Sequence, residues 1–330
     1  MSMILCLVDL DGDAVAKDSK ETLTFARDLA EAHGWETHAA CIGTPPDTAL
    51  SDLREQGVAR VHALQHDHLD VDAAPAALAE ALVQLQRQSD AGGVVGSGTE
   101  HAAEVMAHVG ARLDQPLAAN CTTARPSDDG GWELTRVRWG GVLFEDAHLA
   151  ADVALFTSAA HQTAARPATT SGDAEVVTFT PNLDDPSLHV TRVAERASRG
   201  GGISLATAPV VVSGGRGVGS AEGFGILEEL AGLLGGAVGC SRVATNNGWR
   251  SHNDQVGQTG TRVAPDLYIA CGISGATQHW VGCMSSKRIL AINTDAEAPM
   301  VTRANYAVLG DLHALLPAVV EQVKAHKGIS

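Results

Sequence analysis

Five groups of polar and glycine residues in the C-terminal part of the chain could bind an anionic ligand. They are residues 213–217, Ser241 with Arg242, residues 272–279, Asn293 and Asp311. Glycine lets a backbone approach a ligand closely, and arginine adds a permanent positive charge that suits phosphate. The run Gly-Ile-Ser-Gly at 272–275 leaves a strand and opens an expected helix, so free backbone N–H groups and the helix dipole would face the ligand. This chemistry suits a phosphate or pyrophosphate.

Each group follows a short apolar run that predicts a buried β-strand. Strands are expected at residues 210–212, 237–239, 267–271, 289–292 and 307–309, and helices at 222–235, 274–284 and 312–324. Apolar runs without alternation are typical of a parallel sheet with helices on both faces. The carboxyl ends of its strands share one edge, where open α/β sheets bind ligands. Five groups along one edge indicate a long, extended ligand.

The glycine loops do not match the standard nucleotide fingerprints. Residues 215–219 have the spacing G-x-G-x-G, and no lysine follows at the phosphate-loop position. Arg242 comes after the second strand, where a NAD-binding fold places an acidic residue. An ordinary Rossmann dehydrogenase is therefore disfavoured. An NADP-dependent enzyme with Arg216 or Arg242 on the 2′-phosphate stays open, as does a nucleotide-binding regulator without catalysis.

The chain from about residue 200 to residue 327 resembles the C-terminal FAD-binding domain of the electron transfer flavoprotein alpha subunit. Four motifs in the family's order carry the resemblance: Val-Ser-Gly-Gly-Arg-Gly at 212–217, Gln-Val-Gly-Gln-Thr-Gly at 255–260, Gly-Ile-Ser-Gly-Ala-Thr-Gln-His at 272–279 and Ala-Ile-Asn-Thr-Asp-Ala-Glu-Ala-Pro at 291–299. The resemblance implies a doubly wound parallel sheet that binds FAD.

The resemblance also implies which residues contact the cofactor. Arg242 would lie against the flavin ring, His279 would stabilise negative charge at its pyrimidine end, and Thr259 would contact N5. Arg216 and residues 274–276 would contact the pyrophosphate and ribityl groups. The full implied set is Arg216, Ser241, Arg242, Gln255, Val256, Gly257, Thr259, Gly260, Ser274, Gly275, Ala276, Gln278, His279, Asn293 and Asp311. No catalytic residue and no metal ligand is implied.

Several of these residues also have an ordinary structural interpretation. Taken alone, Arg242 would more often be a surface ion-pair partner, and His279 a helix residue held by a hydrogen bond. Thr259 alone would be a turn residue, and Asp311 alone would cap the helix that starts at Leu312. The joint pattern favours the ligand site, because all of these positions share one sheet edge and one family's spacing.

Length and composition indicate an intracellular protein with two domains. The 330 residues suffice for two cores, and no apolar run approaches the ~20 residues of a membrane span. The N-terminus has no basic segment before its apolar run, so no signal peptide is expected. The six cysteines are scattered, mostly inside apolar runs, with no C-x-x-C motif. They are expected to be small buried hydrophobes in a reducing cytoplasm rather than disulfides or metal ligands.

The charge is divided unevenly along the chain. Residues 208–330 contain nine basic and nine acidic residues, so the whole net charge of −16 belongs to residues 1–207. A neutral C-terminal domain does not repel an anionic dinucleotide. The acidic remainder disfavours nucleic acid and anionic membranes as partners. It could also reflect a salty cell interior.

The N-terminal domain is expected to be a second α/β unit with a predominantly parallel sheet. Domains are predicted at 1–200 and 204–330, with a flexible stretch at 162–174 and the boundary near the glycines of 198–203. Strands are expected at 4–8, 37–42, 61–65 and 93–98, helices at 19–33, 73–87 and 100–112, and an antiparallel pair at 132–139 and 142–144. Ser19 is the expected N-cap of the first helix, and Gly34 its end. His62, His66 and His68 are expected to be exposed loop residues rather than metal ligands.

The resemblance implies an electron carrier without substrate turnover of its own. It would be the FAD-binding alpha subunit of a heterodimer whose N-terminal domain packs on the beta subunit. It would accept electrons from flavin-dependent dehydrogenases and pass them, one at a time, to a membrane quinone oxidoreductase. The beta subunit could carry AMP or a second FAD, and the sequence leaves that choice open.

Overall fold

The computed structural model describes residues 3–69, 74–139, 143–189 and 205–328. The chain divides into two compact units, Met1–Glu195 and Arg196–Ser330, and each is described by itself. The sequence placed the boundary near residues 198–203, which lie outside the described residues. The two-domain α/β architecture predicted from the sequence is confirmed.

The C-terminal unit contains a five-stranded parallel sheet. Its strands are β12 (Val210–Gly214), β13 (Ala237–Cys240), β14 (Leu267–Cys271), β15 (Ile289–Asn293) and β16 (Tyr306–Leu309), in the order β13-β12-β14-β15-β16. Strand β13 is added on one side of β12, and β14 to β16 are added on the other. The strand order therefore reverses between β12 and β14, and doubly wound sheets bind their ligands at such a switch point. All five expected strands are present.

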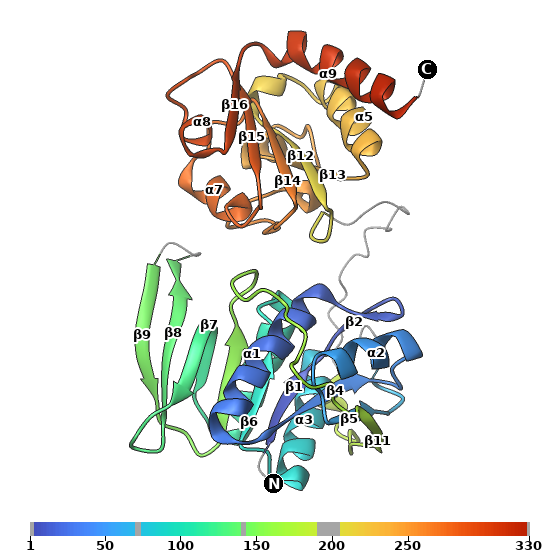
Figure 1. Ribbon diagram of the computed structural model, residues 1–330, viewed down its shortest axis with the longest axis vertical. Helices are drawn as coiled ribbons and strands as arrows, with labels where there is room; N and C mark the ends of the chain where they lie inside the picture. The colour runs from blue at the N-terminus through green and yellow to red at the C-terminus, as the bar shows by residue number, and fades with distance from the viewer. Residues whose placement is uncertain (1–2, 70–73, 140–142, 190–204, 329–330) are drawn as a thin grey trace. The chain divides into compact units, whose positions relative to one another are not determined.

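Helices cover both faces of this sheet. Figure 1 shows α5 (Gly225–Leu234) and α9 (Leu312–Lys327) along one side, and α7 (Thr277–Cys283) and α8 (Pro299–Arg303) along the other. Apolar side chains of α5 and α9 pack against Val212 and Ile269 in one core, while Cys283 and Met300 join Val211 and Ala270 in the second. Alternate residues of one strand therefore enter different cores, as the period of a β-strand requires.

The strand register brings the carboxyl ends to one edge. Gly214 pairs with Cys271, Cys271 with Ile292, and Asn293 with Leu309. The loops that follow these strands must therefore leave the sheet side by side. Short helix α6 (Arg242–Asn246) starts at the same edge, directly after β13.

The N-terminal unit contains a nine-stranded, mostly parallel sheet. The strands are β1 (Met3–Leu7), β4 (Glu36–Ile42), β5 (Arg60–Leu64), β6 (Gly93–Gly96), β7 (Leu117–Pro126), β8 (Trp132–Arg138), β9 (Leu143–Leu149), β10 (Ala154–Ser158) and β11 (Glu175–Phe179), in the order β11-β5-β4-β1-β6-β10-β7-β8-β9. Within this sheet, β7–β8 and β8–β9 pair antiparallel. The β8–β9 pair matches the antiparallel pair expected for residues 132–139 and 142–144, of which residue 142 lies outside the described residues. A small hairpin, β2 (Leu10–Asp11) and β3 (Ala14–Val15), follows β1.

Helices also cover both faces of the larger sheet. Side chains of α1 (Lys17–His33) and α2 (Asp47–Glu55) contribute to one core, and those of α3 (Pro75–Ser89) and α4 (Glu100–Leu113) to the other. The expected helices at 73–87 and 100–112 are present, except that residue 73 lies outside the described residues. Helix α2 and strands β7, β10 and β11 were not predicted.

Two local predictions in the N-terminal unit are wrong. Ser19 does not cap α1, because the helix begins at Lys17 and the Ser19 hydroxyl instead accepts from the backbone N of Asp9. His62 is not an exposed loop residue. It is buried on β5 with its Nε2 atom 3.1 Å from Nδ1 of His38. Gly34 does end α1, in the left-handed conformation expected of a C-terminal glycine.

Residues 162–174 form an irregular segment of the first unit. The backbone N–H groups of Ala168 and Gly172 donate to the carbonyl oxygens of Glu55 and Arg54. All six cysteines of the chain are buried and free. Among the described helices, none combines the length and the apolar character that a membrane crossing requires.

Candidate functional site

A cavity of about 540 Å³ opens at the carboxyl edge of the C-terminal sheet. Its volume lies within the range of cofactor sites. Loops after all five strands contribute to its lining. Ten of the fifteen residues predicted for the site line it: Arg216, Ser241, Arg242, Ser274, Gly275, Ala276, Gln278, His279, Asn293 and Asp311.

Glycines allow the loops after β12 and β14 to pack directly against each other. A Cβ atom on Gly217 would lie 2.8 Å from the Cα of Gly272, and one on Gly215 would lie 2.4 Å from the Gly272 carbonyl oxygen. Because side chains are excluded here, backbone lines this part of the cavity. The sheet reverses its winding between the same two strands.

The segment after β14 presents unpaired backbone donors to the cavity. The N–H groups of Ser274, Gly275 and Ala276 have no acceptor within the described part of the chain, and all three residues line the cavity. The expected helix at 274–284 starts later than predicted, at Thr277. Gly275 has φ +80°, a left-handed conformation that an α-helix cannot include. The free N–H groups therefore belong to an irregular turn rather than to a helix start.

Two arginines add positive charge to the same wall. Arg216 and Arg242 are exposed and form no ion pair with any residue that the structure describes. A guanidinium without a carboxylate partner is available for a bound phosphate or another anion. The alternative interpretation of Arg242 as a surface ion-pair partner has no support in the described contacts.

His279 is the buried titratable group of the cavity. It is 7% exposed, and its Nε2 atom lies 2.8 Å from the hydroxyl oxygen of Tyr268. Burial lowers the pKa of His279 to about 4, and the Val256 backbone offsets a small part of this shift. The imidazole is therefore neutral at pH 7 and adds no positive charge to the cavity. A neutral ring still donates a hydrogen bond from one nitrogen.

Buried polar atoms at this edge lack hydrogen-bond partners. Ser241 Oγ and His279 Nδ1 are buried and unpaired within the described residues, and both side chains line the cavity. Unsatisfied buried polar atoms are costly in a folded protein. Their concentration here indicates that a polar ligand completes the site.

Five predicted contacts do not line the cavity: Gln255, Val256, Gly257, Thr259 and Gly260. They form a turn held next to it, because the backbone N of Gln258 donates to the carbonyl oxygen of Gln278 at 2.8 Å. Within the turn, Gln255 Nε2 donates to the Thr259 hydroxyl at 3.0 Å. This bond leaves the Thr259 proton free to reach another acceptor. Direct contact of these residues with a ligand stays a prediction.

Asn293 and Asp311 combine structural bonds with a place in the lining. Asn293 Nδ2 donates to the Ile273 carbonyl oxygen at 2.9 Å, which fixes the loop after β14. Asp311 Oδ1 accepts from the backbone N of His313 at 2.9 Å and caps α9, so the structural interpretation of Asp311 is confirmed. Asn293 Oδ1 accepts from the backbone N of Asp295 at 3.1 Å, whereas the second carboxylate oxygen of Asp311 can still face a ligand.

Tyr268 was not predicted as part of the site. It belongs to β14, where its aromatic ring fits an apolar run and gives no periodic signal. A buried tyrosine hydroxyl usually has a hydrogen-bond partner. A tyrosine within a buried strand is therefore the only sign in the sequence that a polar side chain lies nearby. Three further residues that were not predicted also line the cavity. Asn246 lies in α6 with Arg242, and Thr294 and Asp295 come directly after Asn293.

Comparison with known proteins identifies relatives along the whole chain. Residues 4–184 match the model of the electron transfer flavoprotein domain, and residues 204–284 match that of the electron transfer flavoprotein FAD-binding domain. The electron transfer flavoprotein subunit alpha of Mycobacterium leprae is 35% identical over 99% of this chain and 100% of its own length. That of Mycobacterium tuberculosis (strain H37Rv) is 36% identical with the same coverage. The subunit of Paracoccus denitrificans is 48% identical over 47% of this chain and 50% of its own length.

Proposed function

The chain belongs to the electron transfer flavoprotein family as an alpha subunit with its FAD-binding domain, and on this premise we propose that it carries electrons from flavin-dependent dehydrogenases to a membrane quinone oxidoreductase. The electrons pass one at a time. Bound FAD supplies the redox chemistry, and the protein supplies binding, orientation and electrostatics. The carrier has no substrate turnover of its own.

The set of unsatisfied donors in the cavity supports this proposal most strongly. The free N–H groups of residues 274–276 and the unpaired guanidinium of Arg216 suit a pyrophosphate. Ser241 Oγ and His279 Nδ1 are buried polar atoms that a ligand's polar groups would satisfy. The residues present therefore fit a flavin dinucleotide.

Arg242 and His279 would then adjust the flavin from two positions. Arg242 holds a full positive charge at the cavity wall and favours the more negative states of a bound ring. His279 is neutral, so its contribution is a hydrogen bond from Nδ1 rather than a charge. Both effects raise the affinity for electrons, and the charged arginine has the longer range.

We place the functional unit in a heterodimer in the cytoplasm. The beta subunit would pack on the N-terminal unit and carry AMP or a second FAD. The six free, buried cysteines support a reducing compartment. The large negative charge of residues 1–207 supports a protein rather than a nucleic acid as partner.

Reduction by candidate donors tests the proposed role. The chain would be co-expressed with the subunit encoded next to it and purified with its flavin. Flavin-dependent dehydrogenases, each with its substrate, would then be added without oxygen. We expect at least one dehydrogenase to bleach the flavin at catalytic concentration, and a quinone oxidoreductase to restore its colour. Reduction by NADPH alone, with no dehydrogenase present, would contradict the carrier role and favour an enzyme.

A further inference from the structure

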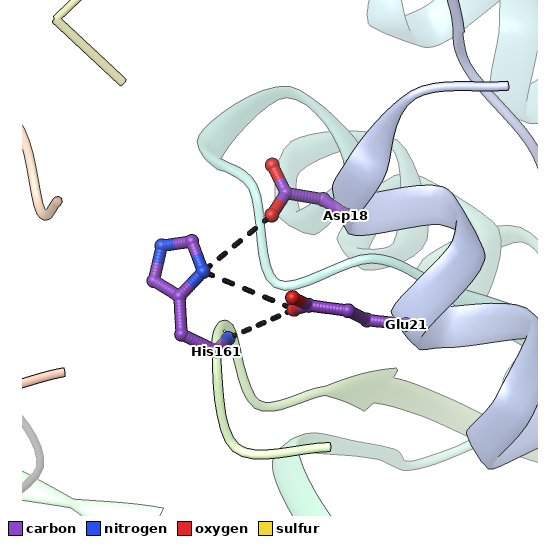
Figure 2. A group of neighbouring side chains, drawn as sticks. All are labelled: Asp18, Glu21 and His161. Carbon is purple, nitrogen blue, oxygen red and sulfur yellow. Dashed lines mark hydrogen bonds and ion pairs between the residues drawn. The ribbon is translucent and has the colours of Figure 1, made fainter. Parts of the chain in front are cut away.

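A second group of ligand-type side chains lies in the N-terminal unit, away from any predicted role. Asp18 and Glu21 belong to the first two turns of α1, and His161 follows β10 (Figure 2). One carboxylate oxygen from each acid and one imidazole nitrogen lie within 4.8 Å of one another. We propose that these three residues bind one divalent transition-metal ion of the Zn²⁺ class.

The distances fit metal ligands better than hydrogen bonds. Nδ1 of His161 lies 3.7 Å from Asp18 Oδ1 and 3.8 Å from Glu21 Oε2. Both separations exceed the ~3.2 Å limit of a normal hydrogen bond. Around a tetrahedral zinc ion with bonds of about 2.0–2.1 Å, neighbouring ligand atoms lie about 3.4 Å apart. For His161, a closing movement of a few tenths of an ångström towards each carboxylate would therefore reach this spacing.

The local structure holds the three side chains in place. Residues three apart on a helix lie on one face, so α1 projects Asp18 and Glu21 in the same direction (Figure 2). The backbone N of His161 donates to Glu21 Oε2 at 3.2 Å, which fixes the histidine loop against the helix. The side chains of Glu21 and His161 are 11% and 12% exposed, whereas that of Asp18 is 36% exposed. Asp18 therefore leaves a route for an ion from solvent.

The charge of the cluster is incompletely balanced. Asp18 Oδ1 is buried and accepts no hydrogen bond from the described residues, so one carboxylate oxygen points into the cluster unsatisfied. A divalent cation would neutralise both carboxylates at once.

The donor types favour zinc or a similar ion over calcium or magnesium. Calcium and magnesium bind through oxygen ligands, and magnesium keeps several waters. One imidazole with two carboxylates suits zinc or manganese instead. Three protein ligands also leave a fourth position of a tetrahedral ion for water. No sequence motif marks this group, because Glu21 and His161 are 140 residues apart.

Zinc titration of the FAD-containing heterodimer, after treatment with EDTA and dialysis, tests this site. We expect one high-affinity zinc ion that disappears in Asp18→Asn, Glu21→Gln and His161→Asn, with affinity at least about tenfold weaker in each. Asparagine suits position 161 because His161 has φ +59°, which asparagine tolerates. Circular dichroism in EDTA would show that the variants remain folded.

A matched control separates this site from a surface histidine pair. His66 and His68 have neighbouring rings and lie elsewhere in the same unit. The double variant His66→Ala/His68→Ala should retain the high-affinity ion. Loss of that ion in the double variant but not in His161→Asn would overturn the proposal. Equal zinc affinity in the wild type and His161→Asn would also overturn it.

Discussion

The hydroxyl oxygen of Tyr268 lies 2.8 Å from Nε2 of His279, and both side chains are buried. Burial raises the pKa of Tyr268 well above its usual value and lowers that of His279 to about 4, so both groups are neutral at pH 7. We propose that the protonated phenol donates to Nε2, which leaves the imidazole proton on Nδ1. The tyrosine would thereby orient the ring and leave Nδ1 as the donor nitrogen of His279.

Replacing Tyr268 by Phe should destabilise the protein and weaken FAD binding. The change leaves a buried imidazole nitrogen without a partner, which costs about 1–3 kcal/mol. Urea unfolding and FAD dissociation measure the two effects. Tyr306 is the other tyrosine of the chain and is 58% exposed, so Tyr306→Phe should change the free energy of unfolding by less than about 0.5 kcal/mol. Equal effects of the two variants would contradict the role of Tyr268.

The removal of Arg242 should lower the affinity of the flavin for electrons. Arg242→Ala takes an unpaired positive charge from the cavity wall, so reduced and more negative flavin states lose stabilisation. We expect the share of one-electron-reduced flavin at half-reduction to fall by about tenfold, equivalent to about 1.4 kcal/mol. Arg288→Ala is the control, because Arg288 is exposed and lies outside the cavity lining. An unchanged share in Arg242→Ala would refute this role.

Two glycine substitutions should have opposite effects on stability. A Cβ atom at Gly275 would lie 2.4 Å from the backbone N of Met300, and the residue has φ +80°. Gly275→Ala should therefore cost at least about 2 kcal/mol and weaken FAD binding. Gly232 lies inside α5 with nothing within 4 Å of its added Cβ, so Gly232→Ala should stabilise by about 0.5–1 kcal/mol. Calorimetric melting of both variants measures the difference.

Acid should destabilise the N-terminal unit through His62. Burial lowers the pKa of His62 to about 4, with smaller contributions from His38 and Arg60, whereas an unfolded histidine titrates near 6.5. Between these values the unfolded state binds more protons, so the free energy of unfolding falls as pH falls from 6.5 to 4. The full effect is about 3 kcal/mol.

Urea unfolding at pH 7 and pH 5 tests the role of His62. The loss of stability at pH 5 should be smaller in His62→Asn than in the wild type. The control His68→Asn replaces an exposed histidine and should keep the wild-type pH dependence. A His62→Asn variant with the full wild-type loss would assign the pH dependence to other groups.

The five strands of the C-terminal sheet were predictable because apolar runs without alternation have few other interpretations. The helix after β14 shows the limit of this approach. Its start depends on Gly275 adopting a left-handed conformation, and glycine is permissive in either region. Sequence periodicity therefore placed the helix three residues too early. The edge strand β11 and the helix α2 were missed because their patterns are short and interrupted by polar residues.

Sequence motifs predicted the site residues that they contain, but not the contacts between residues of different motifs and strands. Ten predicted residues converge on one cavity, because each follows a parallel strand at the same edge. The pairing of Tyr268 with His279 depends on how α7 packs on β14, which no single motif contains. The same reason hid the burial of His62 beside His38, since β4 and β5 place them together only after folding.

The most direct test of the electron-carrier account is a visible spectrum during stepwise anaerobic reduction of the co-expressed heterodimer. We expect a flavin spectrum, with one FAD bound to this chain, that passes through a one-electron-reduced form before it bleaches fully. Direct bleaching in a single two-electron step would contradict one-electron transfer and the proposed action of Arg242. A purified heterodimer without flavin absorbance would contradict FAD binding itself, on which the electron-carrier account depends.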